Sequence, residues 1–128
     1  MAFLANYRCA AKGMLGAYTL NLELVVSSPL DNPGLMSVNG LGTITQATHP
    51  PFYLKTKISG IIHMLNGPTS VAMTGTSFIT GQENFQGVLV LPHGWGKSGS
   101  VSYRFIRGGE QIDIGPVEAE PVAAESAA

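Results

Sequence analysis

The chain has 128 residues, of which 45% are apolar and 12% charged, about half the charged share of an average globular protein. This length predicts a single domain with its own core, the apolar content excludes a disordered chain, and the glycines lack the three-residue period of collagen. A formal net charge of -1, with no run of lysine or arginine, argues against nucleic-acid binding.

A single cysteine, Cys9, excludes an intramolecular disulfide, and we interpret it as a small buried apolar side chain. The first positive charge follows the short apolar run at the N-terminus, which is the reverse of the order in a signal peptide. No apolar stretch approaches the roughly 18 residues that a membrane-spanning helix needs. We therefore expect a soluble protein without a membrane span, cytoplasmic by default, with release by a signal-independent route left open.

Apolar side chains recur at every second position through most of the chain, which is the pattern of β-strands. The clearest example is residues 16–26, where leucines alternate with mostly polar residues. Turn-forming Pro, Gly and Asn residues separate the segments. The predicted strands span residues 16–26, 35–47, 52–65, 71–80, 85–91, 100–106 and 111–114. Residues 2–12 fit a short helix or an eighth strand, and the all-β surroundings favour the strand.

Hairpin-length connections and the lack of a convincing helix predict an antiparallel meander of seven or eight strands. Glycines inside these strands mark bends or close backbone approach, which a sheet needs when it curls up. They are Gly40, Gly42, Gly60, Gly75 and Gly87. The expected fold is therefore all-β, closed either as a small barrel or as a tight sandwich.

The composition changes near residue 115. Residues 1–115 form the expected all-β domain, whereas residues 116–128 are small and acidic and include two prolines. Such a tail is extended or disordered unless a partner holds it. We expect deletion of residues 116–128 to shrink an assembly without unfolding the domain.

The three histidines, His49, His63 and His93, lie in unrelated settings and share no spacing typical of metal ligands or of a catalytic set. We therefore expect no metal, no cofactor and no catalytic residue. The side chains best suited to contact a ligand or a partner are aromatic, basic or histidine. They are Tyr53, His63, His93, Trp95, Lys97, Tyr103 and Arg104. Trp95, the single tryptophan, either makes such a contact or folds back as a plug over the end of the sheet.

Several strands carry apolar side chains on both faces, as at residues 24–26, 61–62 and 88–91. No amphipathic helix is expected to cover a second face, so that face must meet another sheet, line a cavity or bury against another subunit. We therefore favour a non-enzymatic protein that self-associates, as a homo-oligomer or a larger assembly. Apolar strand surface, strand edges and the tail would form its contacts.

Two other functions stay open. A barrel could hold a small apolar ligand inside, with Tyr53, His63, Trp95 and Tyr103 at its mouth. An isomerase or cyclase ranks third, because such chemistry needs little more than a tyrosine, a histidine and an arginine such as Arg104.

Three segments carry a resemblance to a known family. They are VNGLGTITQATHPP at residues 38–51, ISGIIH at residues 58–63 and MTGT at residues 73–76. With this pattern of turns and glycines, the chain resembles a family of short bacterial proteins built on a domain of unknown function, over nearly all residues up to about 115. The resemblance implies a bacterial source and no activity, so it assigns no functional residue.

Overall fold

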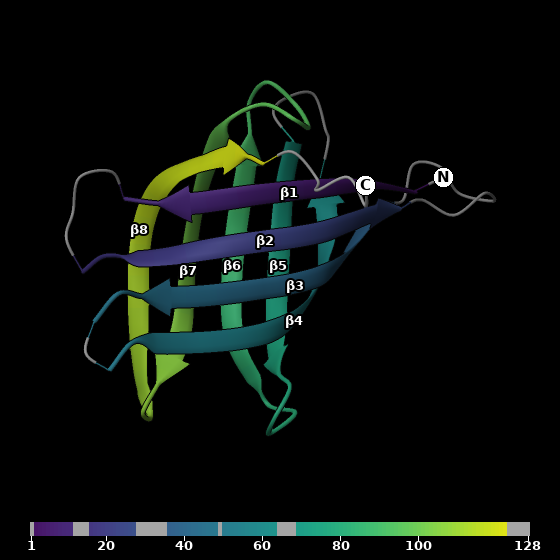
Figure 1. The fold of residues 1–128 in the computed structure, drawn as a ribbon. Coiled ribbons are helices and arrows are strands. Elements are labelled where there is room, and N and C mark those ends of the chain that lie inside the picture. The colour runs from purple at the N-terminus through teal and green to yellow at the C-terminus, as the bar shows by residue number, and fades with distance from the viewer. Residues whose placement is uncertain (1, 12–15, 28–35, 49, 64–68, 123–128) are drawn as a thin grey trace, which may run out of the picture.

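The structure is a computed structural model that describes residues 2–11, 16–27, 36–48, 50–63 and 69–122. Eight strands form a closed barrel in which each strand pairs antiparallel with the next in sequence (Figure 1). They are β1 (Ala2–Ala10), β2 (Tyr18–Ser27), β3 (Ser37–Gln46), β4 (Phe52–His63), β5 (Thr69–Ser77), β6 (Glu83–Leu91), β7 (Gly99–Arg107) and β8 (Glu110–Pro121). The predicted antiparallel meander is confirmed. Of the two expected architectures, barrel and sandwich, the barrel is observed. Residues 2–10 form a strand and not a helix.

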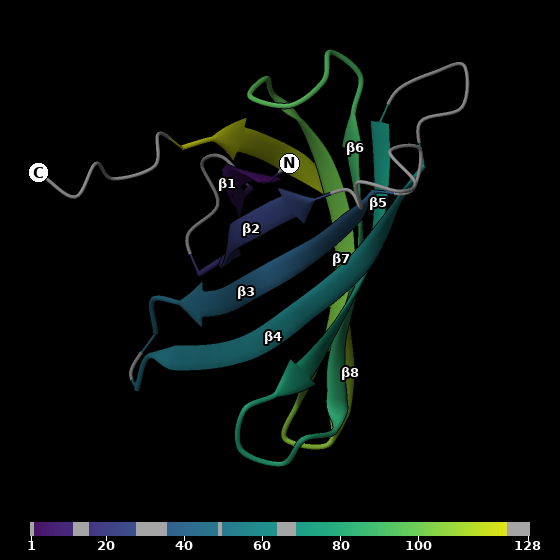
Figure 2. The same cartoon turned by 90° about the vertical axis from the view of Figure 1, so that its right-hand side faces the viewer.

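The barrel has two halves whose strands run across one another. Figure 1 shows β1–β4 crossing in front of β5–β8, and Figure 2 shows β4 sweeping from one half towards the other. Gly60 of β4 pairs with Met73 of β5, and a Cβ atom at this position would lie only 2.5 Å from the carbonyl oxygen of Ala72. Only a glycine lets the two backbones approach this closely. The prediction that glycines inside strands mark close backbone approach is therefore confirmed at Gly60.

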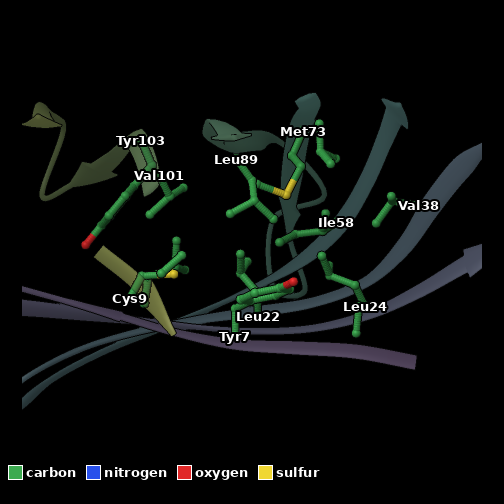
Figure 3. Close-up of a cluster of buried hydrophobic side chains, with 14 of the residues drawn as sticks. Tyr7, Cys9, Leu22, Leu24, Val38, Ile58, Met73, Leu89, Val101 and Tyr103 are labelled. Atoms are coloured by element: carbon green, nitrogen blue, oxygen red, sulfur yellow. The ribbon is translucent and has the colours of Figure 1, made fainter. Parts of the chain in front are cut away.

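Alternate side chains of each strand point into the barrel and fill it, as the period of two predicts. The largest fully buried side chains come from both halves: Tyr7, Phe85, Phe105, Leu20, Leu22, Leu24, Ile44, Ile58, Leu89, Leu91, Val26 and Val38. Figure 3 shows part of this cluster, with Leu22 and Leu24 reaching towards Leu89 and Met73. Eight strands enclose a space that side chains can fill, and burying each such side chain contributes roughly 1.5–3 kcal/mol.

The last strand is longer than the predicted segment 111–114. β8 continues to Pro121, so residues 116–121 are extended and pair with β7 and β1 of the same chain. The register shifts between Val101↔Val117 and Tyr103↔Ile114, which places two β8 residues, Gly115 and Pro116, opposite one residue of β7. This bulge bends β8 towards β1. The small, acidic composition with two prolines, which predicted a tail from residue 116, therefore did not prevent residues 116–121 from pairing as a strand.

The position of β8 also changes the expected effect of removing the tail. Deleting residues 116–128 would remove the strand segment that closes the barrel, so we now expect this deletion to destabilise the domain. Residues 123–128 lie outside the described residues.

β5 ends three residues before the predicted end at residue 80. The hydroxyl oxygen of Ser77 accepts hydrogen bonds from the backbone N–H groups of Ile79 (3.1 Å) and Thr80 (3.2 Å). The N–H of Gly81, whose φ is 70°, donates to the carbonyl of Ser77. A serine hydroxyl that binds nearby backbone donors competes with strand pairing, so residues 78–81 form the turn to β6.

Candidate functional site: the seam between β1 and β8

The barrel closes over a short seam. Within the part of the chain that the structure describes, β1 and β8 pair through Tyr7↔Pro121, Arg8↔Glu120 and Cys9↔Ala119, and the N–H of Val122 then donates to the carbonyl oxygen of Asn6 at 2.8 Å. By contrast, β2 and β3 pair along their whole length. On the far side of this seam, residues 2–5 of β1 pair with β2 on one side, and no described strand pairs with their other side.

The backbone of β1 presents hydrogen-bonding groups along this open side. In a strand, the N–H and C=O of one residue point to the same side, and the side alternates from residue to residue. The carbonyl of Asn6 faces the seam, because it accepts from Val122. Leu4 and Ala2 therefore direct their N–H and C=O groups to the same side, past the end of the seam.

Apolar side chains surround the open side. Leu4 is 64% exposed on the outer face and lies directly opposite Val25 of β2, which is 40% exposed. Val122, at the end of the seam, is also exposed. A hollow of about 260 Å³ lies here, lined by Phe3, Leu4, Ala5, Asn6, Tyr7, Trp95, Gly96, Pro121 and Val122. The open edge of β1 therefore borders an apolar hollow.

Trp95 forms the inner wall of this hollow and acts as a plug. It packs against the core and makes an edge-to-face contact with Phe3, with 5.6 Å between ring centroids. The next residue, Gly96, donates its N–H to the hydroxyl oxygen of Tyr7 at 3.0 Å, and burial raises the pKa of Tyr7. The indole N–H of Trp95 is buried without a hydrogen-bond partner. Of the two interpretations of Trp95, the plug matches this position.

The candidate mouth of a ligand barrel does not form. Tyr53 and His63 lie ten positions apart on β4, which corresponds to roughly 33 Å of strand, so they sit towards opposite ends of the barrel. Both are exposed on the outer face, whereas Tyr103 points inside and Trp95 plugs one end. The grouping failed because strand length separates residues that share a face.

Tyr103 belongs to the interior. Its ring stacks on Phe105 and contacts Phe85, with centroid separations of 6.1 and 6.0 Å. Its hydroxyl is buried without a hydrogen-bond partner, and burial raises its pKa. Burial also raises the pKa of the Cys9 thiol from 9.0 to about 12, so this thiol is protonated near neutral pH. The interpretation of Cys9 as a buried apolar side chain is confirmed.

The remaining candidates are exposed. His93 and Lys97 are exposed in the connection between β6 and β7. Arg104 lies on the outer face of β7 and forms an ion pair with Asp113 at 3.6 Å, with both side chains more than half exposed. A second hollow, of about 490 Å³, surrounds this pair on the outer wall of β5–β8, and Gln86, Ser102 and Gly115 also line it. His49 lies outside the described residues.

The chain matches one family model over residues 1–110, described as domain of unknown function (DUF1842). It belongs to the DUF1842 family. The resemblance to a family built on a domain of unknown function is thereby confirmed. A search of curated proteins finds no match. The DUF1842 region contains β1–β7 and ends at the first residue of β8, so the β1 edge and Trp95 lie inside it and Val122 lies beyond it.

The DUF1842 barrel holds one arginine that sequence reasoning missed. Arg107, half-buried at the barrel end opposite Trp95, donates from Nη1 to the hydroxyl of Tyr18 and to Oε1 of Gln46, both at 2.7 Å. Its guanidinium also lies 4.2 Å from the ring centroid of Phe52. The alternation of side chains along β7 could have predicted this position. Phe105 points inward, so Arg107, two residues later, lies on the same face.

Within the described residues, no group of three or more His, Cys, Asp or Glu side chains is placed to hold a metal ion. The same residues include no helix long and apolar enough to cross a membrane.

Proposed function

We propose that this DUF1842 protein is a non-enzymatic β-barrel protein that self-associates into a homo-oligomer or a larger assembly. The observation that carries the proposal is apolar surface on the outside of a barrel whose interior is already filled. Leu4, Val25, Ile61 and Val88 are large apolar side chains, each at least 40% exposed on the outer faces of strands.

These side chains are neighbours in the sheet rather than scattered. Leu4 pairs with Val25 across β1 and β2. Ile61 pairs with Ala72, and Ala72 pairs with Val88, so three outward apolar residues form a strip across β4, β5 and β6. Contiguous apolar surface of this kind is typical of protein–protein interfaces, because its removal from water is favourable.

The packing of the interior supports assembly over ligand binding. Tyr7, Phe85 and Phe105 are fully buried inside the barrel together with leucines from β2 and β6, so side chains occupy the space that a ligand would need. The dispersal of Tyr53, His63 and Tyr103 over the outer face and the interior likewise supports a non-enzymatic role.

Sedimentation velocity over a wide range of concentrations, with negative-stain images of the largest species, tests the proposal. We expect a defined species heavier than the 13.4 kDa chain, or a filament, at micromolar concentration. A single 13.4 kDa species at every concentration would overturn self-association.

A further inference from the structure

We infer that the open edge of β1, at residues 2–5, is where a second copy of this chain docks, by antiparallel pairing of the two β1 edges. The inference rests on the proposed self-association and names its interface. A fully closed barrel has no free edges, but here Val122 is the last described residue that bonds to β1, at Asn6, and no described strand pairs with residues 2–5 on that side. An unpaired strand edge is a template for another strand, because its N–H and C=O groups need partners.

The other edge of the seam is protected against such pairing, and this contrast points to β1. Residues 110–117 of β8 also lack a described strand on their β1 side. That edge carries the bulge at Gly115 and Pro116, and proline has no N–H to donate. Residues 2–5 of β1, in contrast, are Ala, Phe, Leu and Ala, with no charge and no proline.

A second copy fits this edge because antiparallel pairing of two identical edges is symmetric about a twofold axis. The carbonyl of Asn6 is already bonded to Val122, so the groups left for a new strand are those of Ala2 and Leu4. In the register that pairs Ala2 of each copy with Leu4 of the other, the free N–H and C=O groups of both residues gain hydrogen-bond partners. The twofold axis then passes through the pair formed by Phe3 of the two copies. The added strand would enter the hollow of about 260 Å³ beside Trp95.

The outer face supports the same arrangement. Leu4 and its neighbour Val25 are exposed on one copy, and edge pairing would bring the same two side chains of the second copy alongside them. The two copies would thus form a continuous apolar strip across the new strand pair. The alternative occupant of the edge is the chain's own six residues after Val122. The experiment below distinguishes binding of these residues from binding of a second copy.

The test compares two matched substitutions in the full chain. Leu4→Lys places a charge at the open edge, a device that discourages edge pairing. Ile106→Lys is the control, because Ile106 is also an exposed large apolar side chain (41%), but it lies on β7, pairs with Gln111 of β8 and belongs to neither apolar cluster. Circular dichroism and thermal unfolding establish that each variant is folded.

We expect Leu4→Lys to weaken association at least tenfold, measured as the dissociation constant by sedimentation equilibrium, and Ile106→Lys to weaken it less than threefold. We also expect the Leu4 amide to be protected from hydrogen exchange in the oligomer and to exchange freely after dilution. Equal weakening by both substitutions would overturn the docking edge and leave self-association standing. A wild-type chain that is monomeric throughout would overturn both.

A chain truncated after Val122 distinguishes the alternative occupant. If a second copy binds the edge, the truncated chain associates as the full chain does. Association that strengthens tenfold or more on truncation would assign the edge to residues 123–128 in the full chain and overturn the inference.

Discussion

The backbone N–H of Val122 donates to the carbonyl oxygen of Asn6 at 2.8 Å, and this bond is where the pairing of β1 with β8 ends. On one side of it the barrel is closed by three residue pairs, and on the other side no described strand pairs with the outer edge of residues 2–5 of β1. The closing strand and the open edge are therefore parts of one seam. Stability of the fold depends on the first part, and the proposed association depends on the second.

Two truncations separate these parts. A chain that ends at Gly115 loses all the β8 residues that pair with β1, so we expect a large fall in melting temperature or loss of the folded state. A chain that ends at Val122 keeps every described pair and should melt within a few degrees of the full chain. Thermal unfolding followed by circular dichroism measures both, and equal melting temperatures would show that the seam does not stabilise the barrel.

Gly60→Ala should destabilise the barrel by about 1–3 kcal/mol, because the new methyl group would lie 2.5 Å from the carbonyl oxygen of Ala72. Gly115→Ala is the control, since nothing lies within 4 Å of a Cβ atom at that position. We expect its effect to stay within about 0.5 kcal/mol. Urea unfolding gives both values. A Gly60→Ala variant as stable as the control would contradict the close approach of β4 and β5.

Arg107→Met should cost about 1–2 kcal/mol of unfolding free energy. The substitution removes hydrogen bonds to Tyr18 and Gln46 and the contact of the guanidinium with the ring of Phe52. Arg104→Met breaks only an exposed ion pair with Asp113 and should cost less than about 0.5 kcal/mol. The same urea experiment measures both, and the reverse order would refute a structural role for Arg107.

Alkaline pH should destabilise the protein through the buried thiol of Cys9. Burial raises its pKa in the folded state from 9.0 to about 12, so the unfolded state loses the proton first. Stability is full below about pH 9 and falls as the pH rises towards 12, by on the order of 4 kcal/mol in total. Tyr7 and Tyr103 have raised pKa values for the same reason and add to the fall above pH 10.

The Cys9→Ala variant isolates the contribution of the thiol. Its urea midpoint should fall less steeply between pH 9 and 10 than that of the wild-type chain. In parallel, the wild-type thiol at pH 8 should react with iodoacetamide slowly when folded and rapidly in urea. Identical pH slopes for the two chains, or rapid reaction of the folded thiol, would be incompatible with burial of Cys9.

Most strands could be predicted from the sequence because inward and outward side chains alternate so regularly. In β2, every second residue from Leu20 to Val26 is fully buried. β8 could not be delimited, because the bulge at Gly115 and Pro116 breaks the alternation where the strand bends towards β1. A bulge of this kind is a property of the partner strand as much as of its own residues.

The candidate site was less accessible to sequence reasoning. The side chains expected at one barrel mouth have the right chemistry, but Tyr53 and His63 are separated by most of a strand. The open edge at residues 2–5 depends on where β8 stops pairing with β1, which is a contact between the two ends of the chain. Local patterns predict faces of strands, whereas the free edge follows from the closure of the whole barrel.

Light scattering behind a sizing column tests the central claim, self-association through the apolar outer wall, most directly. The wild-type chain is compared with the double variant Leu4→Lys/Ile61→Lys, which places a charge in both apolar clusters of that wall. We predict a wild-type mass that is a multiple of 13.4 kDa and a folded, monomeric double variant. A wild-type chain that elutes at 13.4 kDa at the highest attainable concentration would contradict the account.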